Sequence, residues 1–210
     1  MRGLAVKGKD MRDAALRKDK DRLLQPIARR WFVHVHPNWI SAAALGFGLA
    51  CALAAWQQHY LAALLLWAVN RILDGLDGLV AREHAKQSDF GGYLDLFLDF
   101  IVYLAVPVAI AAAQPSNALL WATVALFGAF VLNLLSWSVL SAILEKRAAT
   151  DTGSLTTVAM PGGLIEGAET IIFYTLFLLL PTYAALLFLV MAVLVLVTAA
   201  QRVAWAARHL

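Results

Sequence analysis

The sequence predicts an all-α, polytopic membrane protein with six transmembrane helices and an N-terminal amphipathic juxtamembrane helix. Hydrophobic residues make up 61% of the 210 residues, and the mean hydropathy is +0.72. Soluble domains contain about 45–50% apolar residues, and a soluble globule of this size could not bury the excess. The charged residues, 15% of the chain, are clustered rather than evenly spread. Together these observations exclude the soluble classes.

Three long segments without Asp, Glu, Lys or Arg contain most of the predicted spans. These segments cover residues 31–70, 100–144 and 170–201. A spanning helix needs about 20 apolar residues, and polar or proline-containing tips near Gln57, Gln114 and Pro181 divide the apolar sequence. We therefore expect helices over residues 38–56, 60–82, 91–113, 117–142, 163–180 and 182–204.

The basic residues predict the orientation of these spans. Ten of the 17 Lys and Arg residues lie in the first 30 residues, and a six-span layout puts the other clusters on the same side. The positive-inside rule assigns that side to the cytoplasm. We expect both termini to be cytoplasmic, in an integral membrane protein of a bacterial inner membrane.

The N-terminal segment carries basic residues together with apolar ones that share one helical face. The apolar residues are Leu16, Leu23, Ile27 and Trp31. This pattern favours a helix on an anionic membrane surface, with a solvated linker as the alternative, and Pro26 opposes one straight helix. We expect residues 1–36 to form a cytoplasmic amphipathic segment and residues 37–210 to form one membrane domain.

Four aspartates fall inside predicted spans, where ionisable groups are costly and mark functional sites. Asp74 and Asp77 are three residues apart, and Asp95 and Asp99 are four apart, so each pair shares one helical face. The pairs lie at matching depths, within about two to three helical turns of the loop that joins their helices. Two adjacent antiparallel helices would thus gather the four carboxylates around one cavity that opens toward the cytoplasm.

Four neighbouring carboxylates cannot all ionise without compensating charge. Two divalent cations would supply it, and ligation by oxygen atoms alone suits Mg²⁺ or Mn²⁺. Two such cations can hold a diphosphate and stabilise an in-line displacement at phosphorus. The alternative is a partly protonated cluster, or one paired with Arg71 and Arg82.

The aspartates belong to a longer pattern, Asp74-x2-Asp77-Gly78-x2-Ala81-Arg82-x8-Gly91-x3-Asp95-x3-Asp99. This pattern resembles the signature of the CDP-alcohol phosphatidyltransferase family, with all eight positions and all spacings present. Pro37-Asn38 and Ser88 are similar to weaker features of the same family. The six-span layout and the amphipathic N-terminal segment extend the resemblance over most of the chain.

The resemblance implies transfer of a phosphatidyl group from CDP-diacylglycerol, or a similar CDP-linked lipid, to the hydroxyl of an alcohol, with release of CMP. It implies that Asp74, Asp77 and Asp95 ligate two divalent cations, Mg²⁺ or Mn²⁺. Asp99 would ligate one of them and act as the general base. The residues that would contact the CDP-lipid are Asn38, Gly78, Ala81, Arg82 and Ser88. Family members are commonly homodimers, and we expect a homodimer and no nucleic-acid partner.

The identity of the alcohol is less well specified by the sequence. The residues that we expect near the acceptor are Arg147, Glu166 and Glu169, with glycerol 3-phosphate as the default acceptor. Lys146 and Arg202 either bind a phosphorylated acceptor or serve only as topology anchors. The two glutamates either receive a cationic or polyhydroxyl acceptor or pair with a basic residue.

A divalent-cation transporter or channel is the main alternative function. A transporter would carry its acids near the bilayer centre, with access from both faces. Here the aspartates lie toward one side, and the opposite tips carry no charge. This asymmetry favours the enzyme.

Overall fold

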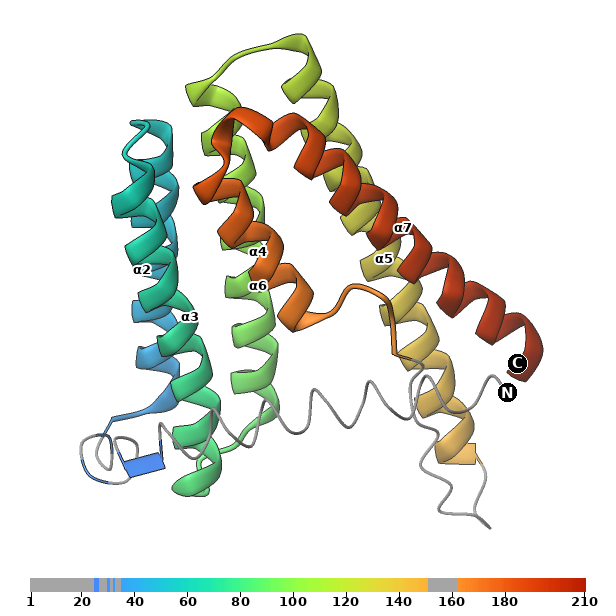
Figure 1. Ribbon diagram of the computed structural model, residues 1–210. Coiled ribbons are helices and arrows are strands. Elements are labelled where there is room, and N and C mark those ends of the chain that lie inside the picture. The colour runs from blue at the N-terminus through green and yellow to red at the C-terminus, as the bar shows by residue number, and fades with distance from the viewer. Residues whose placement is uncertain (1–24, 27–29, 31, 33–34, 151–161) are drawn as a thin grey trace. The chain divides into compact units, whose positions relative to one another are not determined.

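The structure of the protein is a computed structural model that describes residues 25–26, 30, 32, 35–150 and 162–210. Most of the predicted amphipathic helix lies outside these residues. Every element from residue 35 onward in the described part of the chain is helical, which confirms the all-α prediction (Figure 1). The elements are α2 (Pro37–Trp56), α3 (Tyr60–Glu83), α4 (Asp89–Ala113), α5 (Asn117–Thr150), α6 (Gly167–Leu179), the 3₁₀ helix η1 (Pro181–Tyr183) and α7 (Ala184–His209).

The first three helices begin and end within two residues of the predicted positions. Helix α5 continues to Thr150, eight residues past the predicted end at 142, because the polar residues after the apolar segment are good helix formers. Helix α6 begins only at Gly167, four residues after the predicted start. The residues before it form a loop in which the Glu166 carboxylate accepts a hydrogen bond from the Gly163 N–H at 2.6 Å.

Among the residues that the structure describes, four segments are long and apolar enough to cross a membrane. They are Pro37–Trp56, Asp89–Ala113, Asn117–Arg147 and Pro181–His209. Helix α6, with 13 residues, is apolar but shorter. Helix α3 has 24 residues but carries Asn70, Arg71, Asp74 and Asp77 along its length, so the predicted functional residues themselves reduce its hydropathy.

The chain divides into two compact units, residues 1–116 with 174–184 and residues 117–173 with 185–210. In the first unit α2 packs against both α3 and α4 (Figure 1). A Cβ at Gly48 would collide with the side chain of Val102, so the absence of a side chain allows α2 to approach α4 closely. The buried Asn70 side chain of α3 donates to the Ala44 carbonyl of α2 at 2.7 Å.

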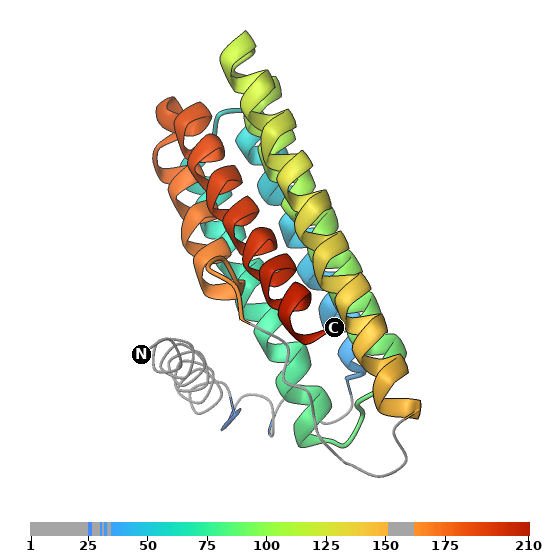
Figure 2. The ribbon, with the colours of Figure 1, turned by 90° about the vertical axis from the view of Figure 1, so that its right-hand side faces the viewer.

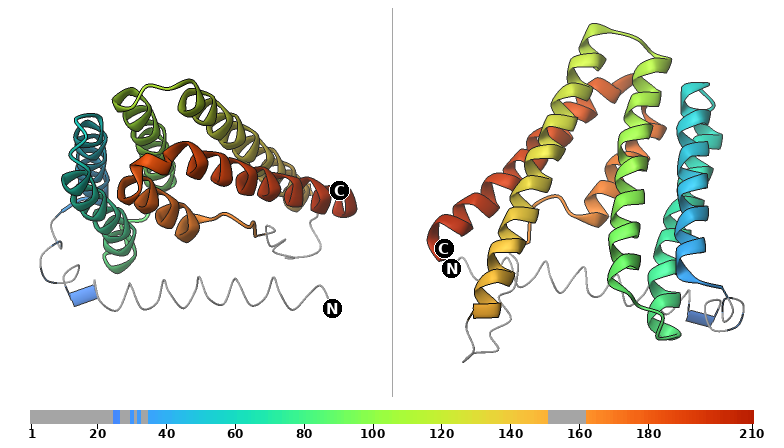
Figure 3. Two further views of the ribbon diagram at one scale, coloured as in Figure 1. Left: turned by 45° about the horizontal axis from the view of Figure 1, so that its top comes forward. Right: turned by 180° about the vertical axis from the view of Figure 1, so that it is seen from behind.

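In the second unit α7 runs alongside α5 (Figures 2 and 3). The Arg202 guanidinium of α7 donates to the Asn133 side chain of α5 at 2.6 Å. The Thr198 hydroxyl accepts from the backbone N–H groups of Leu164 and Ile165 at 3.1 and 2.9 Å. The Thr198 contacts fix the loop that leads into α6.

Candidate active site

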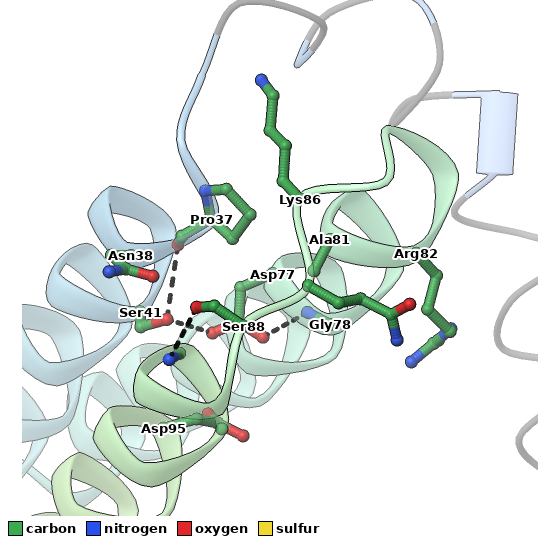
Figure 4. A pocket seen from close by; sticks show the side chains of 13 residues that line it. Pro37, Asn38, Ser41, Asp77, Gly78, Ala81, Arg82, Lys86, Ser88 and Asp95 are labelled. Atoms are coloured by element: carbon green, nitrogen blue, oxygen red, sulfur yellow. Dashed lines mark hydrogen bonds between the residues drawn. The ribbon is translucent and has the colours of Figure 1, made fainter.

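A pocket of about 190 Å³ lies where α2 begins, α3 ends and α4 begins (Figure 4). Two of the four aspartates, Asp77 and Asp95, line this pocket. It is also lined by all five residues that the sequence analysis assigned to the CDP-lipid, namely Asn38, Gly78, Ala81, Arg82 and Ser88. Six of the eight signature residues therefore surround one cavity, and Asp74 and Asp99 lie outside its lining.

Asp77 is held in place by the neighbouring helix. The residue is 4% exposed, and its Oδ2 accepts a hydrogen bond of 2.6 Å from the Ser41 hydroxyl of α2. Its Oδ1 accepts from the backbone N–H of Gly78. Ser41 is itself buried and also hydrogen-bonds the Pro37 carbonyl one turn earlier. The start of α2 thus fixes a carboxylate that α3 supplies (Figure 4).

The loop between α3 and α4 is shaped by Ser88, which caps the N-terminus of α4. The Ser88 hydroxyl accepts from the Gly91 N–H at 3.0 Å, as is typical of a serine at this position. A Cβ on Gly91 would lie 3.1 Å from the Ser88 hydroxyl and 3.6 Å from the Asn38 side-chain oxygen. Glycine at this signature position therefore keeps the cavity open between the first turn of α4 and α2.

Asp99 and Asp74 are paired with a buried arginine. The Arg71 Nη2 atom lies 2.6 Å from Asp99 Oδ1, and its Nη1 atom lies 3.2 Å from Asp99 Oδ2. A longer ion pair of 3.5 Å joins Arg71 to Asp74. Nη1 also donates to the Tyr103 hydroxyl at 3.0 Å. The alternative that the sequence left open, pairing with Arg71, is thus realised for two of the four acids.

The four carboxylates form one electrostatic cluster. The Asp74 carboxyl lies within hydrogen-bonding reach of those of Asp95 and Asp99, and Asp77 interacts with the other three through space. In the described ranges, no three His, Cys, Asp or Glu side chains form a group that could hold a metal ion. Both oxygens of Asp99 accept from Arg71, and those of Asp77 accept from Ser41 and Gly78.

The donor set nevertheless fits the cations that the sequence suggests. All four groups offer carboxylate oxygens, which Mg²⁺ and Mn²⁺ prefer over nitrogen or sulfur. Asp77 and Asp95 line the cavity directly. The expected pair of cations remains a prediction.

The residues expected near the acceptor lie in the second unit. The Glu169 carboxylate accepts from the Glu166 N–H at 3.1 Å, so the two glutamates organise the first turn of α6. The charge of Glu166 also acts on Arg202. Arg147 donates to the carbonyls of His209 and Leu210 at 3.2 and 2.6 Å.

Sequence reasoning missed Ser41 and the aromatic residues around Arg71. Ser41 lies one turn after Pro37-Asn38, so helical spacing from that pair would have placed it on the same face. The guanidinium of Arg71 lies 4.7 Å from the Trp67 ring and 5.4 Å from the Tyr103 ring. Tyr103 is one turn beyond Asp99, a spacing that could have identified it. Nothing in the sequence distinguishes Trp67 from an ordinary apolar residue of a span.

Comparison with known proteins decides what kind of protein has this site. Residues 34–208 match the CDP-alcohol phosphatidyltransferase family, which is most of the chain. This chain belongs to that family. It is therefore an enzyme of the CDP-alcohol phosphatidyltransferase class, and the transporter alternative is abandoned. The family is in general dependent on divalent cations.

Several relatives are similar in sequence to part of this chain. An inner membrane protein of Escherichia coli (strain K12), YnjF, is 37% identical over 152 residues, which cover 72% of this chain and 73% of that protein. A bifunctional IPC transferase and DIPP synthase of Aquifex aeolicus (strain VF5) is 36% identical over 99 residues, 46% of this chain and 23% of that protein.

An archaetidylinositol phosphate synthase of Pyrococcus horikoshii is 34% identical over 65 residues, 31% of this chain and 35% of that protein. The chain thus spans about a quarter to a third of these last two relatives. The inner membrane relative and the apolar helices identify the CDP-alcohol phosphatidyltransferase as an integral membrane protein.

Proposed function

We propose that this enzyme transfers a phosphatidyl group from CDP-diacylglycerol, or a similar CDP-linked lipid, to the hydroxyl of a small alcohol and releases CMP. The observation that carries the proposal is the pocket at the ends of α2, α3 and α4. It brings two acidic signature residues together with the glycine, alanine and arginine positions of the same signature. Family membership supplies the reaction class.

The pocket suits a nucleotide diphosphate. Small residues at Gly78 and Ala81 leave room for a flat base beside α3, and Arg82 places an exposed cation at the rim where it can pair with a phosphate. The Ser88 hydroxyl accepts from a backbone N–H, which leaves its own proton available for donation to a ligand. Asn38 offers a further side-chain amide at the start of α2.

The proposed cation ligands are Asp74, Asp77, Asp95 and Asp99. Two bound Mg²⁺ or Mn²⁺ ions would offset the negative charge of the diphosphate and of the departing CMP. Asp99 would act as the general base, because the pKa of an alcohol lies far above 7 and a positioned carboxylate can accept its proton as the new bond forms.

The proposed transfer is a single displacement. The hydroxyl oxygen of the acceptor forms a bond to the lipid-bearing phosphorus, and the bond from that phosphorus to the bridging oxygen breaks. The electron pair of the broken bond leaves with CMP, and the hydroxyl proton passes to the Asp99 carboxylate. No covalent enzyme intermediate is needed.

We propose a phosphorylated polyol as the acceptor, glycerol 3-phosphate or an inositol phosphate. The Pyrococcus relative is an archaetidylinositol phosphate synthase, which favours the inositol phosphate. Arg147, Glu166 and Glu169 are the proposed acceptor residues. The side chain of each residue is hydrogen-bonded to a backbone group of its own unit. Contact with the acceptor would therefore require these hydrogen bonds to be replaced by bonds to the acceptor.

We further propose the membrane arrangement that the sequence suggests. Residues 37–210 would form one six-span domain, in which the polar helix α3 and the short helix α6 complete the four apolar spans. Residues 1–36 would form a cytoplasmic amphipathic segment. Both termini and the pocket would face the cytoplasm of a bacterial cell, and the enzyme would work as a homodimer.

The test is CMP release by the purified protein from CDP-diacylglycerol, with Mn²⁺ or Mg²⁺ and a panel of acceptors. The panel contains glycerol 3-phosphate, inositol, inositol phosphate, serine, choline and phosphatidylglycerol. We expect release that requires both the cation and one phosphorylated acceptor, and that is lost in Asp99→Asn. If folded protein neither binds CDP-diacylglycerol nor releases CMP from it, the proposed donor is wrong.

A further inference from the structure

Arg71 is a buried cation, and each of its three guanidinium nitrogens donates a hydrogen bond to a nearby side chain. Its side chain is 9% exposed. Its Nη1 and Nη2 atoms grip both oxygens of Asp99, and its Nε donates to the Asn70 side-chain oxygen at 2.7 Å. Two parallel N–H···O bonds of this kind are the strongest and most directional form of an arginine–carboxylate pair. Arg71 is not one of the eight signature positions, so the family pattern assigns it no role.

Two aromatic rings also hold the guanidinium of Arg71 in place. Its guanidinium lies over the rings of Trp67 and Tyr103, an arrangement that stabilises a cation by attraction to the aromatic quadrupole. Those rings are anchored in turn. The Trp67 Nε1 donates to the Thr175 hydroxyl at 3.2 Å, and the Tyr103 hydroxyl donates to Asp99 Oδ2 at 3.2 Å. These contacts hold the Arg71 guanidinium beside Asp99.

Contact with Arg71 divides the four aspartates into two classes. Asp77 and Asp95 line the pocket, whereas Asp74 and Asp99 are the two that Arg71 contacts. A divalent cation at Asp99 would have to replace bonds to a fixed guanidinium and remain close to its positive charge. A cation at Asp77 and Asp95 would break no bond to Arg71, although the charge of Arg71 also acts on Asp95. A diphosphate bound in the pocket would bring negative charge close to this pair and offset the repulsion.

We propose that Arg71 is a positioning residue that serves as the counter-ion of Asp99. Under this proposal one divalent cation binds at Asp77 and Asp95 without nucleotide, and a second binds at Asp99 only together with the diphosphate. The consequence is an order of binding, since the general base stays paired with Arg71 until the substrate arrives. The proposal rests on the proposed function, because it takes the four aspartates as cation ligands.

The test counts Mn²⁺ ions bound to the full-length protein in detergent, by electron paramagnetic resonance titration, with and without CDP. The wild-type protein should bind one Mn²⁺ alone and two with CDP. In Arg71→Gln the count without CDP should rise to two, because the competing cation is gone. Asp99→Asn should bind one Mn²⁺ in both conditions. Arg208→Gln, which removes an exposed arginine near the C-terminus, should behave as wild type.

The outcomes separate this inference from the proposed function. Two Mn²⁺ ions on the wild-type protein without CDP, or loss of the first ion in Asp99→Asn, would overturn the role of Arg71. If Arg71→Gln does not fold, the wild-type and Asp99→Asn counts still decide the question. The expected counts without CMP release from CDP-diacylglycerol would overturn only the proposed reaction. No bound Mn²⁺ in either condition would overturn both.

Discussion

Each of the two units holds an arginine against an asparagine, but the two arginines differ in what else surrounds them. Arg71 in α3 contacts Asn70, and Arg202 in α7 contacts Asn133, with N···O distances of 2.7 and 2.6 Å. Arg71 also grips Asp99 through two bonds. Within the described residues Arg202 has a buried Nε without a hydrogen-bond partner.

This difference shows how the role of a buried arginine can be inferred from its partners. In the second unit Arg202 joins two helices, and its acidic neighbour Glu166 is occupied with the backbone of its own loop. In the first unit Arg71 is bound to an acid that belongs to a catalytic signature. Burial alone does not separate a structural from a functional arginine, whereas the identity of the paired carboxylate does.

The largest expected effect is on the rate of CMP release, in a comparison of Asp99 with Glu166. Asp99→Asn should lower kcat for CMP release by about 10²–10⁴-fold, the usual contribution of a general base. Glu166→Gln should leave kcat unchanged and raise only the KM of the acceptor, because its amide oxygen can still accept from Gly163. Steady-state kinetics with both substrates varied measure this. Equal losses of kcat in the two variants would contradict the division into catalytic and acceptor-side acids.

A smaller effect is expected from the serine hydroxyls of the two units. Ser41→Ala removes the bond that orients Asp77, and the Kd for Mn²⁺ should rise by about 10–100-fold, as when an outer partner of a metal ligand is lost. Ser136→Ala is the matched control, because that hydroxyl donates to the Asn133 carbonyl of its own helix at 2.7 Å. Its Mn²⁺ affinity should not change. Indistinguishable Mn²⁺ titrations of the two variants would argue against Ser41 as a support for Asp77.

The smallest effects concern helix packing, and they should appear in stability rather than in catalysis. Gly48→Ala should destabilise the protein by about 1–3 kcal/mol, because its Cβ would collide with Val102. Gly46→Ala lies in the same helix with nothing within 4 Å of the added Cβ, and should be neutral or stabilising by up to about 1 kcal/mol. Thermal unfolding in detergent measures both. A lower midpoint for Gly46→Ala than for Gly48→Ala would refute the packing argument.

The second unit offers the same pair of substitutions. A Cβ at Gly163 would collide with Thr198, whereas one at Gly128 of α5 would meet nothing within 4 Å. Gly163→Ala should therefore lower the unfolding midpoint and Gly128→Ala should not. If only the first unit showed such a contrast, the loop before α6 would tolerate displacement that α2 does not.

Much of the fold was predictable because spanning helices follow from local sequence. Apolar segments of sufficient length, ended by polar tips, located α2, α3 and α4 to within two residues. The errors arose where the ends of a helix do not coincide with the ends of an apolar segment. Helix α5 continues through polar residues to Thr150, and α6 is delayed to Gly167 by side-chain bonds to the preceding loop.

The composition of the candidate site was also predictable, since the eight signature residues have fixed spacings on two adjacent helices. Asn38 and Ser88 both line the pocket, and their contact with the CDP-lipid stays a prediction. The support that Ser41 gives to Asp77 was not predicted, because it comes from a different helix 36 residues away. A hydrogen bond across helices depends on their rotation and depth, which no local pattern encodes.

By itself the sequence determined the helical membrane architecture, the enzyme family and the identity of the four aspartates, because each of these depends on local composition or on fixed spacing along the chain. The tertiary structure alone decided how the aspartates are divided. It placed Asp77 against Ser41 at the pocket and Asp99 against Arg71 beside two aromatic rings. Spacing puts a carboxylate on a face of its helix, but only the packing of neighbouring helices determines which cation or hydroxyl it meets there.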